Sequence, residues 1–212
     1  MTKKKLIIWD WNGTLLNDMH ICVQAINHLL SERKKPVITI EGYKEIFTFP
    51  VKNYYIAAGF DFSKESFDGP ALQFMDLYKK QIGNAGLFPE AVHVLKYFQS
   101  KNLLQALLSA MEHQLLLKTI KEKHIDDYFQ SVLGIEDHFA NGKVHQAQKL
   151  FKRFKLAPEE VILIGDTIHD HEKKKKIGCD AILISHGHQS HKRLLSTDRQ
   201  IIHNLEELTL II

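Results

Sequence analysis

Two short apolar runs of the sequence end in acidic residues. Residues 6–9 are followed directly by Asp10, and residues 161–164 are followed by Asp166 and, four positions later, Asp170. Continuous apolar runs of this length are typical of strands buried on both faces of a parallel sheet. Ligands of such sheets bind beyond the carboxyl ends of the strands, so we expect the three carboxylates in one crevice. Because gathered carboxylates repel one another, a hard divalent cation is expected among them, which predicts a Mg²⁺ site.

Each of these acids also has a purely structural explanation. An Asp after a strand commonly caps the segment that follows it. Asp166 and Asp170 stand at the start of a predicted helix, where negative charge is favourable. Helix capping readily explains one acid at the start of a helix, but it is a weaker explanation for two acids on the same helix. Both explanations stay open for each acid alone, and the combination of three favours the metal site.

A hydroxyl, a main-chain amide and an ammonium group complete the set of candidate groups. Ser109 and the amide of Ala110 follow the apolar run 103–108, so we expect them at the same crevice, where they would hold phosphate oxygens. Lys143, which follows Gly142, would neutralise charge that builds up on a transferring phosphoryl group. Singly these signals are weak, because a Ser before a helix is commonly an N-cap and most lysines are solvated.

The elements that must position these residues alternate between strands and helices. Further strands are predicted at 103–108 and 181–184, with 201–202 as a weak edge candidate. The segments with helical spacing between the strands are 90–99, 113–123, 144–154 and 169–177. The alternation predicts an α/β fold with a Rossmann-like, doubly wound and mainly parallel sheet.

One long interval breaks this alternation. Roughly seventy residues separate the first strand from the next, which is far more than a crossover needs. Helical spacing within the interval is found at 18–30, 51–58 and 67–82. We therefore expect an inserted α-helical cap domain at residues 17–86 and a core domain formed by residues 1–16 and 87–212.

The composition of the 212-residue chain limits its partners. Its 28 Lys and Arg residues against 25 Asp and Glu residues give a net charge of +3, too slight an excess to indicate nucleic acid. No apolar stretch approaches the roughly 20 residues of a membrane span. The two cysteines, Cys22 and Cys179, form no disulfide framework, which favours a reducing compartment. We expect a cytoplasmic protein that acts on a small molecule, without nucleic acid or membrane partners, and its oligomeric state stays open.

In order and spacing, the candidate residues resemble the four motifs of the haloacid dehalogenase superfamily. Those motifs are Asp-x-Asp-x-Thr, Ser or Thr, Lys, and Gly-Asp-x-x-x-Asp. In this sequence they read Asp10-Trp11-Asn12-Gly13-Thr14, Ser109, Lys143 and Gly165-Asp166-x-x-x-Asp170. Among members of the superfamily the chain looks most like the phosphoglycolate phosphatase-like phosphatases, and the long interval after the first motif is where the family places its helical cap.

The resemblance implies a magnesium-dependent phosphatase that hydrolyses a small phosphorylated metabolite through an aspartyl-phosphate intermediate. It makes Asp10 the nucleophile. The metal ligands that it implies are Asp10, Asp166, Asp170 and the main-chain carbonyl of Asn12. The phosphate-binding residues are Ser109, Ala110, Thr14 and Lys143, with Lys149 as a competing choice for the motif lysine.

Asn12 is the main departure from the family pattern. It stands where most phosphatases of the family have a second Asp, which protonates the leaving alcohol and then activates water. An amide does neither, and loss of this help would cost roughly 10²–10⁴-fold in rate. Three explanations stay open: a substrate with a good leaving group such as an acyl phosphate, a surrogate acid such as His20 or His169, and a protein that binds phosphoesters and scarcely turns them over.

The 13 histidines of the chain raise the alternative of a transition metal. His186, His188 and His191 lie close together in the sequence but lack the spacing of a structural zinc site. His186 and His188 follow a predicted strand, so they are also candidates to line the phosphate crevice. The four lysines at 173–176 are explained better by a solvated helix face than by nucleic acid.

Overall fold

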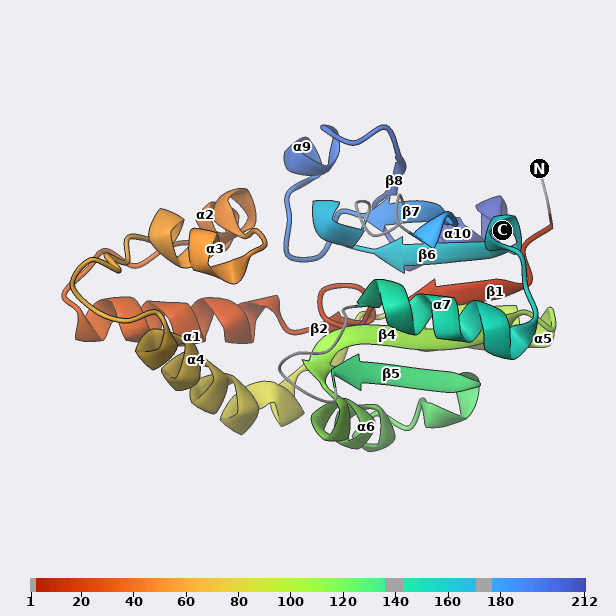
Figure 1. Cartoon of the computed structure of the whole chain (residues 1–212), viewed down its shortest axis with the longest axis horizontal. Helices are drawn as coiled ribbons and strands as arrows, with labels where there is room; N and C mark the ends of the chain where they lie inside the picture. Colours follow the sequence, from red (N-terminus) through yellow and green to blue (C-terminus); the bar gives the residue numbers. More distant parts are fainter. Residues whose placement is uncertain (1–2, 136–142, 171–176) are drawn as a thin grey trace.

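The computed structural model describes residues 3–135, 143–170 and 177–212, with the backbone alone for 143–147. Six strands form one sheet in the order β5-β4-β1-β6-β7-β8, and every pair in it is parallel. The strands are β1 (Leu6–Trp9), β4 (Leu104–Glu112), β5 (Ser131–Ile135), β6 (Val161–Gly165), β7 (Asp180–Ile184) and β8 (Gln200–Ile202). Because β1 pairs with β4 on one side and with β6 on the other, the carboxyl ends of these three strands lie side by side (Figure 1). The predicted doubly wound α/β fold is confirmed.

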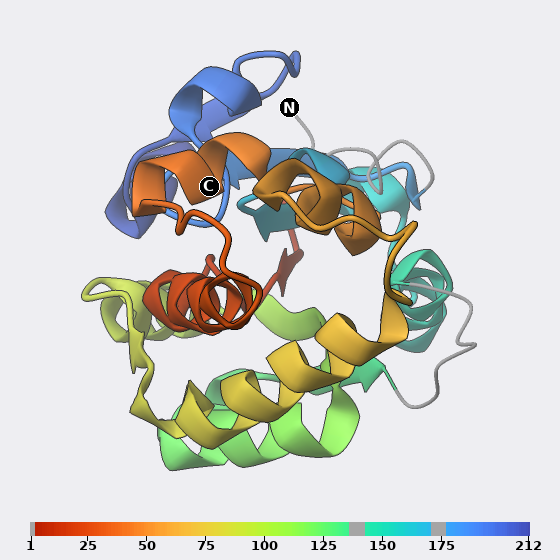
Figure 2. The ribbon, with the colours of Figure 1, turned by 90° about the vertical axis from the view of Figure 1, so that its left-hand side faces the viewer.

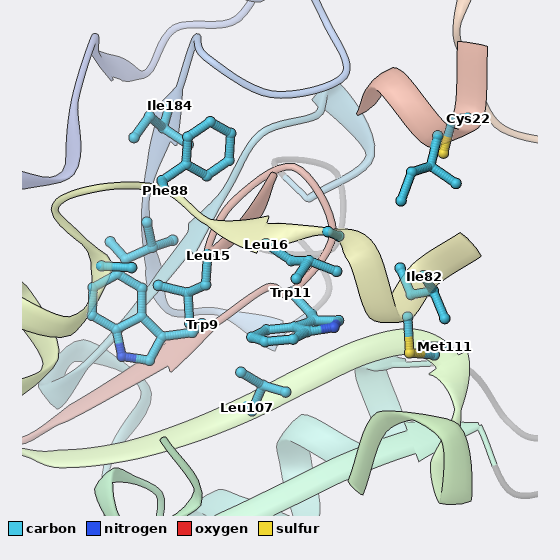
Figure 3. Packing of buried hydrophobic residues seen from close by; sticks show 14 of the residues in the cluster. Trp9, Trp11, Leu15, Leu16, Cys22, Ile82, Phe88, Leu107, Met111 and Ile184 are labelled. Carbon is cyan, nitrogen blue, oxygen red and sulfur yellow. The ribbon is translucent and has the colours of Figure 1, made fainter. Parts of the chain in front are cut away.

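Both faces of the sheet are covered, which explains why the strands are apolar without interruption. Ile7 and Trp9 of β1 belong to a large apolar cluster with side chains of the helices on one face, and Figure 3 shows Trp9, Trp11 and Leu107 within it. Leu6 and Ile8 point the other way, into a second cluster. The helices of the core are α5 (Ala91–Ser100), α6 (His113–Glu122), α7 (Lys143–Phe154), α9 (His191–Leu194) and α10 (Leu208–Ile211), with short 3₁₀ turns η2 (Asp126–Tyr128), η3 (Pro158–Glu160) and η4 (Leu205–Glu207).

Four helices lie between the two strands of a small second sheet. These are α1 (Met19–Glu32), α2 (Ile40–Ile46), α3 (Val51–Ala58) and α4 (Asp68–Gln81), followed by the 3₁₀ turn η1 (Ile82–Asn84). The flanking strands β2 (Leu16–Asn17) and β3 (Gly86–Leu87) pair antiparallel, so the helical segment leaves and re-enters the core at one place. Figure 2 views the molecule from the side of these helices. The predicted helical cap is thus observed, and its predicted domain boundaries, which fall inside the β2–β3 sheet, stay a prediction.

The structure also differs from the sequence-based expectations. β4 continues to Glu112 instead of ending at 108, because the chain beyond that point alternates buried and exposed residues and is not an apolar run. The strand β5 and the helix α2 were not predicted; β5 is a half-buried edge strand and α2 buries only Tyr43. Most of the helix expected at 169–177 lies outside the described residues. In the described part of the chain, every helix is too short or too polar to cross a membrane.

Candidate active site

Three carboxylates meet where β1 and β6 end. The register of the two strands places Trp9 beside Ile164, and the amide of Asp10 donates to the carbonyl of Ile164 at 2.8 Å. Asp10, Asp166 and Asp170 are buried, and each offers a carboxylate oxygen within 4.8 Å of the others. The parallel sheet therefore brings Asp10 together with two acids that lie more than 150 positions later in the sequence.

Glycines allow the chain to pass close to these acids. Gly13 has φ +70°, and a Cβ atom at this position would lie 2.2 Å from Oδ2 of Asp166. A Cβ atom at Gly165 would lie 2.6 Å from Cγ of Asp170. Both positions therefore require glycine, Gly13 for its left-handed backbone as well as for space.

The electrostatics of the acid cluster favour a bound cation. Burial is the main cause that raises the pKa of Asp166 to about 7; the charge of His188 opposes this shift, and the charges of Asp10 and Asp170 contribute to it. Asp170 accepts hydrogen bonds from the hydroxyl and the amide of Thr167 at 2.7 Å and 3.2 Å. A divalent cation would stabilise all three ionised carboxylates at once, and hard oxygen ligands are those that Mg²⁺ prefers. The residues present therefore fit a Mg²⁺ ion.

Ser109 lies near this cluster, inside the extended part of β4. Its hydroxyl donates to Oδ1 of Asn12 at 3.4 Å and accepts from the amide of Met111 at 3.0 Å. The helix α6 is capped by Glu112, whose carboxylate accepts from two main-chain amides at its start. Ser109 is therefore not an N-cap, which removes the structural alternative considered for it.

The other side chains predicted to bind phosphate are Thr14 and Lys143, with Lys149 as the alternative lysine. Thr14 is buried, and its hydroxyl lies 3.5 Å from Oδ1 of Asp166. Lys143 is the first residue of α7, but its side chain lies outside the described residues, so its contact with phosphate stays a prediction. Lys149, the competing lysine, is exposed on α7.

A pocket of about 220 Å³ lies between the acid cluster and the cap helices. Its lining from the core consists of Asp10, Asn12, Ser109, Ala110, Met111, Glu112, Asp166, Thr167, Asp170 and His188. Its lining from the cap consists of Asp18, Cys22, Tyr43, Phe47, Phe49, Val51, Phe74, Met75 and Tyr78. The pocket therefore joins the predicted reacting groups to a wall supplied by the cap.

Comparison with known proteins identifies the family. The model of the haloacid dehalogenase-like hydrolase family matches residues 7–184. This chain is a haloacid dehalogenase-like hydrolase. It is similar to the phosphoglycolate phosphatase of Thiobacillus denitrificans, with 23% identity over 98% of this chain and 95% of the relative. The phosphoglycolate phosphatase 1 of Pseudomonas aeruginosa is 21% identical over 96% of this chain and 78% of the relative.

Solved structures show the same fold. A haloacid dehalogenase-like hydrolase from Streptococcus pneumoniae superposes with a TM-score of 0.86 at 21% identity, over 100% of this chain and 99% of that one. Protein Tyrosine Kinase A from Mycobacterium tuberculosis superposes with a TM-score of 0.82 at 18% identity, again over 100% and 99% of the two chains. Since proteins with such different names share the fold, the activity has to be argued from the site.

In this haloacid dehalogenase-like hydrolase the side chain of Asn12 contacts two cap residues that the sequence did not single out. Its amide nitrogen lies 2.7 Å from Oδ2 of Asp18 and 2.6 Å from the hydroxyl of Tyr78. The hydroxyl of Tyr78 in turn donates to Asp18 at 2.6 Å. Asn12 thus donates to a buried carboxylate, in a position where a second acid would face Asp18 directly.

Asp18 is also paired with His188, which follows β7. Nε2 of His188 lies 3.2 Å from Oδ1 of Asp18, and its Nδ1 lies 2.8 Å from the hydroxyl of Tyr43. Burial opposes ionisation of both partners. The pair nevertheless lowers the pKa of Asp18, with help from hydrogen bonds, and raises the pKa of His188 to about 9. The sequence marked His188 as a possible lining residue, whereas Asp18 was taken only as the start of a helix.

The histidines considered from the sequence have different partners. His20 is exposed and lies outside the pocket lining, and His169 stacks on Phe49 with ring centroids 4.8 Å apart. His186 stacks on Phe88, and His191 stacks on His203. His186, His188 and His191 therefore do not act as one ligand set. Among the histidines whose side chains are described, His188 lines the pocket.

Proposed function

We propose that this chain is a magnesium-dependent phosphatase that hydrolyses a small phosphate ester through an aspartyl-phosphate on Asp10. The observation that carries the proposal is the position of Asp10, which lies in a pocket beside two further buried acids and the hydroxyl of Ser109. Family membership and the names of the relatives support the same reaction class.

The reaction has two steps at Asp10. An oxygen of its carboxylate attacks phosphorus, the bond between phosphorus and the ester oxygen breaks, and the ester oxygen leaves with the electron pair and takes a proton from water to form the alcohol. Water then attacks phosphorus, which releases inorganic phosphate and restores the carboxylate. Ser109, the amide of Ala110 and, as predicted, Thr14 and Lys143 would hold the phosphoryl oxygens.

The metal ion would be held by the acid cluster. Its ligands would be Asp10, Asp166, Asp170 and the main-chain carbonyl of Asn12. A bound Mg²⁺ supplies positive charge that offsets the charge of the phosphoryl oxygens. Gly13, next to Asn12, keeps the main chain close to Asp166, as this ligand set requires.

A second candidate function is a phospho-ligand binding or regulatory protein with very slow turnover. The observation that favours it is Asn12, whose amide donates to Asp18 and is unable to protonate a leaving alcohol. This candidate predicts binding of phosphorylated compounds without their hydrolysis.

Release of inorganic phosphate from a panel of phosphate esters tests the proposal. The panel includes acetyl phosphate and 2-phosphoglycolate, and each compound is assayed with Mg²⁺ and again after chelation of the metal. Asp10→Asn should lower turnover by roughly 10³-fold or more. Asp76→Asn, which removes an exposed carboxylate on α4, is the matched control and should leave turnover unchanged. If the wild type and Asp10→Asn are equally inert with every compound, the binding protein is the better description.

A further inference from the structure

The cap supplies the pocket with an apolar wall. Of the nine cap residues that line it, five are Phe, Val or Met side chains, and Asp18 is the one that carries a charge. The cap is described along its whole length, and it contributes no Lys, Arg or His to this lining. A substrate group that reaches the cap therefore meets aromatic and aliphatic carbon and not a cation.

The aromatic rings of this wall come from two segments. Phe47 stacks on Tyr43 with centroids 5.2 Å apart and meets Phe49 edge-on at 5.5 Å. On α4, Phe74 and Tyr78 stack with centroids 6.1 Å apart. Figure 2 shows α4 on one side of the central strands and the α2–α3 pair on the other. Aromatic rings in such a wall favour flat, apolar partners, which gain from stacking as well as from burial.

Part of this wall is exposed although it is apolar. Phe49, Val51 and Met75 are 36%, 37% and 39% exposed, and all three line the pocket. Apolar side chains grouped around a pocket, unlike those scattered singly over a surface, indicate an apolar ligand.

Two cations near the pocket, His188 and Lys44, already have partners. His188 uses one ring nitrogen for Asp18 and the other for Tyr43. Lys44 donates to the carbonyls of Ser185 and His186. A carboxylate on the leaving group would therefore compete with existing partners for His188 and Lys44, and it would lie beside the carboxylate of Asp18, the one charged side chain of the cap lining.

The chemistry of Asn12 points in the same direction. Without an acid at this position, the leaving oxygen departs as an anion. A phenol has a pKa of about 10, far below the roughly 16 of water, so an aryl oxide leaves without a proton donor much more readily than an alkoxide does.

We propose that the substrate is an aryl phosphate, the phosphate ester of an uncharged aromatic alcohol, whose ring lies against Phe47, Phe49 and Met75. This inference rests on the proposed phosphatase function. In the reaction a bond forms between Asp10 and phosphorus, the bond between phosphorus and the aryl oxygen breaks, and the aryl oxide leaves with the electron pair and takes a proton from water.

Four phosphate esters test two properties of the substrate separately, the presence of an aromatic ring and the ease with which the leaving oxide departs. They are phenyl phosphate, benzyl phosphate, ethyl phosphate and 2-phosphoglycolate, assayed with the full chain and Mg²⁺. Phenyl phosphate should have the highest kcat/KM, about tenfold or more above 2-phosphoglycolate. Benzyl phosphate should have a similar KM but a lower kcat, because its ring fits while its alkoxide leaves poorly. If 2-phosphoglycolate or ethyl phosphate is the best substrate, the inference fails and the phosphatase function stands. If none of the four is hydrolysed, both fail.

Introducing a positive charge into the apolar wall tests directly whether this wall selects the leaving group. Met75→Arg places a guanidinium at the pocket and should raise the ratio of kcat/KM for 2-phosphoglycolate to that for phenyl phosphate by about tenfold. Leu72→Arg adds the same charge on α4, at a side chain that is 67% exposed and lies outside the lining, and should leave the ratio unchanged. An unchanged ratio in Met75→Arg, or equal changes in the two variants, would overturn the assignment of this wall to the leaving group.

Discussion

The half-buried Asn12 and the buried Asp18 form one hydrogen-bonded unit, and this unit explains why an amide suits position 12. The amide donates to a carboxylate that also accepts from Tyr78, from the amide of Gly13 and from His188. With Asp at position 12, a second carboxylate would face the buried carboxylate of Asp18, where like charges are costly. The departure from the family motif is therefore matched by a second residue six positions later, a relation that the sequence alone did not show.

The variant Asn12→Asp should be less stable than the wild type. We expect a loss of about 2–4 kcal/mol in the free energy of unfolding at pH 8, because one of two facing carboxylates is left without a donor. Urea unfolding in the presence of a metal chelator measures this loss without compensation from a bound cation. In the double variant with Asp18→Asn, a coupling energy of about 1 kcal/mol or more is expected, whereas simple additivity would argue against the contact.

At the scale of elements, the sequence predicted what depends on local pattern. β1, β6 and β7 are continuous apolar runs, and each lies within a residue of its expected bounds. The end of β4 and the edge strand β5 were not predicted, because half-buried strands carry a weaker apolar signal. The acid cluster was predicted because strand ends converge in a parallel sheet.

The network around Asn12 could not be predicted in this way. Asp18, Tyr78 and His188 come from the start of α1, from α4 and from the loop after β7, and only the packing of the cap on the core brings them together. No spacing rule relates such positions, since each contact depends on where two elements pack against one another.

Two buried tyrosines on neighbouring cap helices provide a matched comparison. Tyr78 on α4 contacts Asp18 and Asn12 through its hydroxyl, whereas the hydroxyl of Tyr54 on α3 has no hydrogen-bond partner among the described residues. Tyr78→Phe should lower the free energy of unfolding by about 1–3 kcal/mol, because Asp18 loses a donor. Tyr54→Phe should be neutral or stabilise by up to about 1 kcal/mol. Urea unfolding of both variants measures the difference, and equal losses would contradict the contacts of Tyr78.

At the scale of the molecule, the loop after β7 connects the cap, the turn after Asp10 and the core. His188 contacts Tyr43 of α2, Gln189 donates to the carbonyl of Phe47, and His186 contacts the carbonyl of Thr14. The pocket is therefore closed by residues far apart in the sequence, and its shape depends on the fold as a whole. The parallel sheet thus positions Asp10, and the cap supplies the facing part of the pocket lining.

His186 makes the stability of the folded chain depend on pH. Its ring stacks on Phe88 with centroids 3.5 Å apart, and burial lowers its pKa to about 4, with Lys44 acting in the same direction and the hydrogen bond to Thr14 opposing it. The unfolded chain binds a proton at this site below about pH 6.5, whereas the folded chain does so only near pH 4, so protons favour unfolding throughout this interval. The free energy of unfolding should therefore fall by about 2–3 kcal/mol from this residue as the pH drops from 6.5 to 4.

His186→Gln isolates this contribution, because glutamine can still donate to the carbonyl of Thr14 and does not titrate. Urea unfolding at a series of pH values should give a curve for the variant that is flatter than the wild-type curve by this amount between pH 6.5 and 4. The control His93→Gln changes an exposed histidine on α5 and should leave the wild-type slope intact. The buried carboxylates contribute equally to all three curves and therefore do not affect the comparison. Parallel curves for the wild type and His186→Gln would mean that burial does not hold His186 neutral in the folded chain.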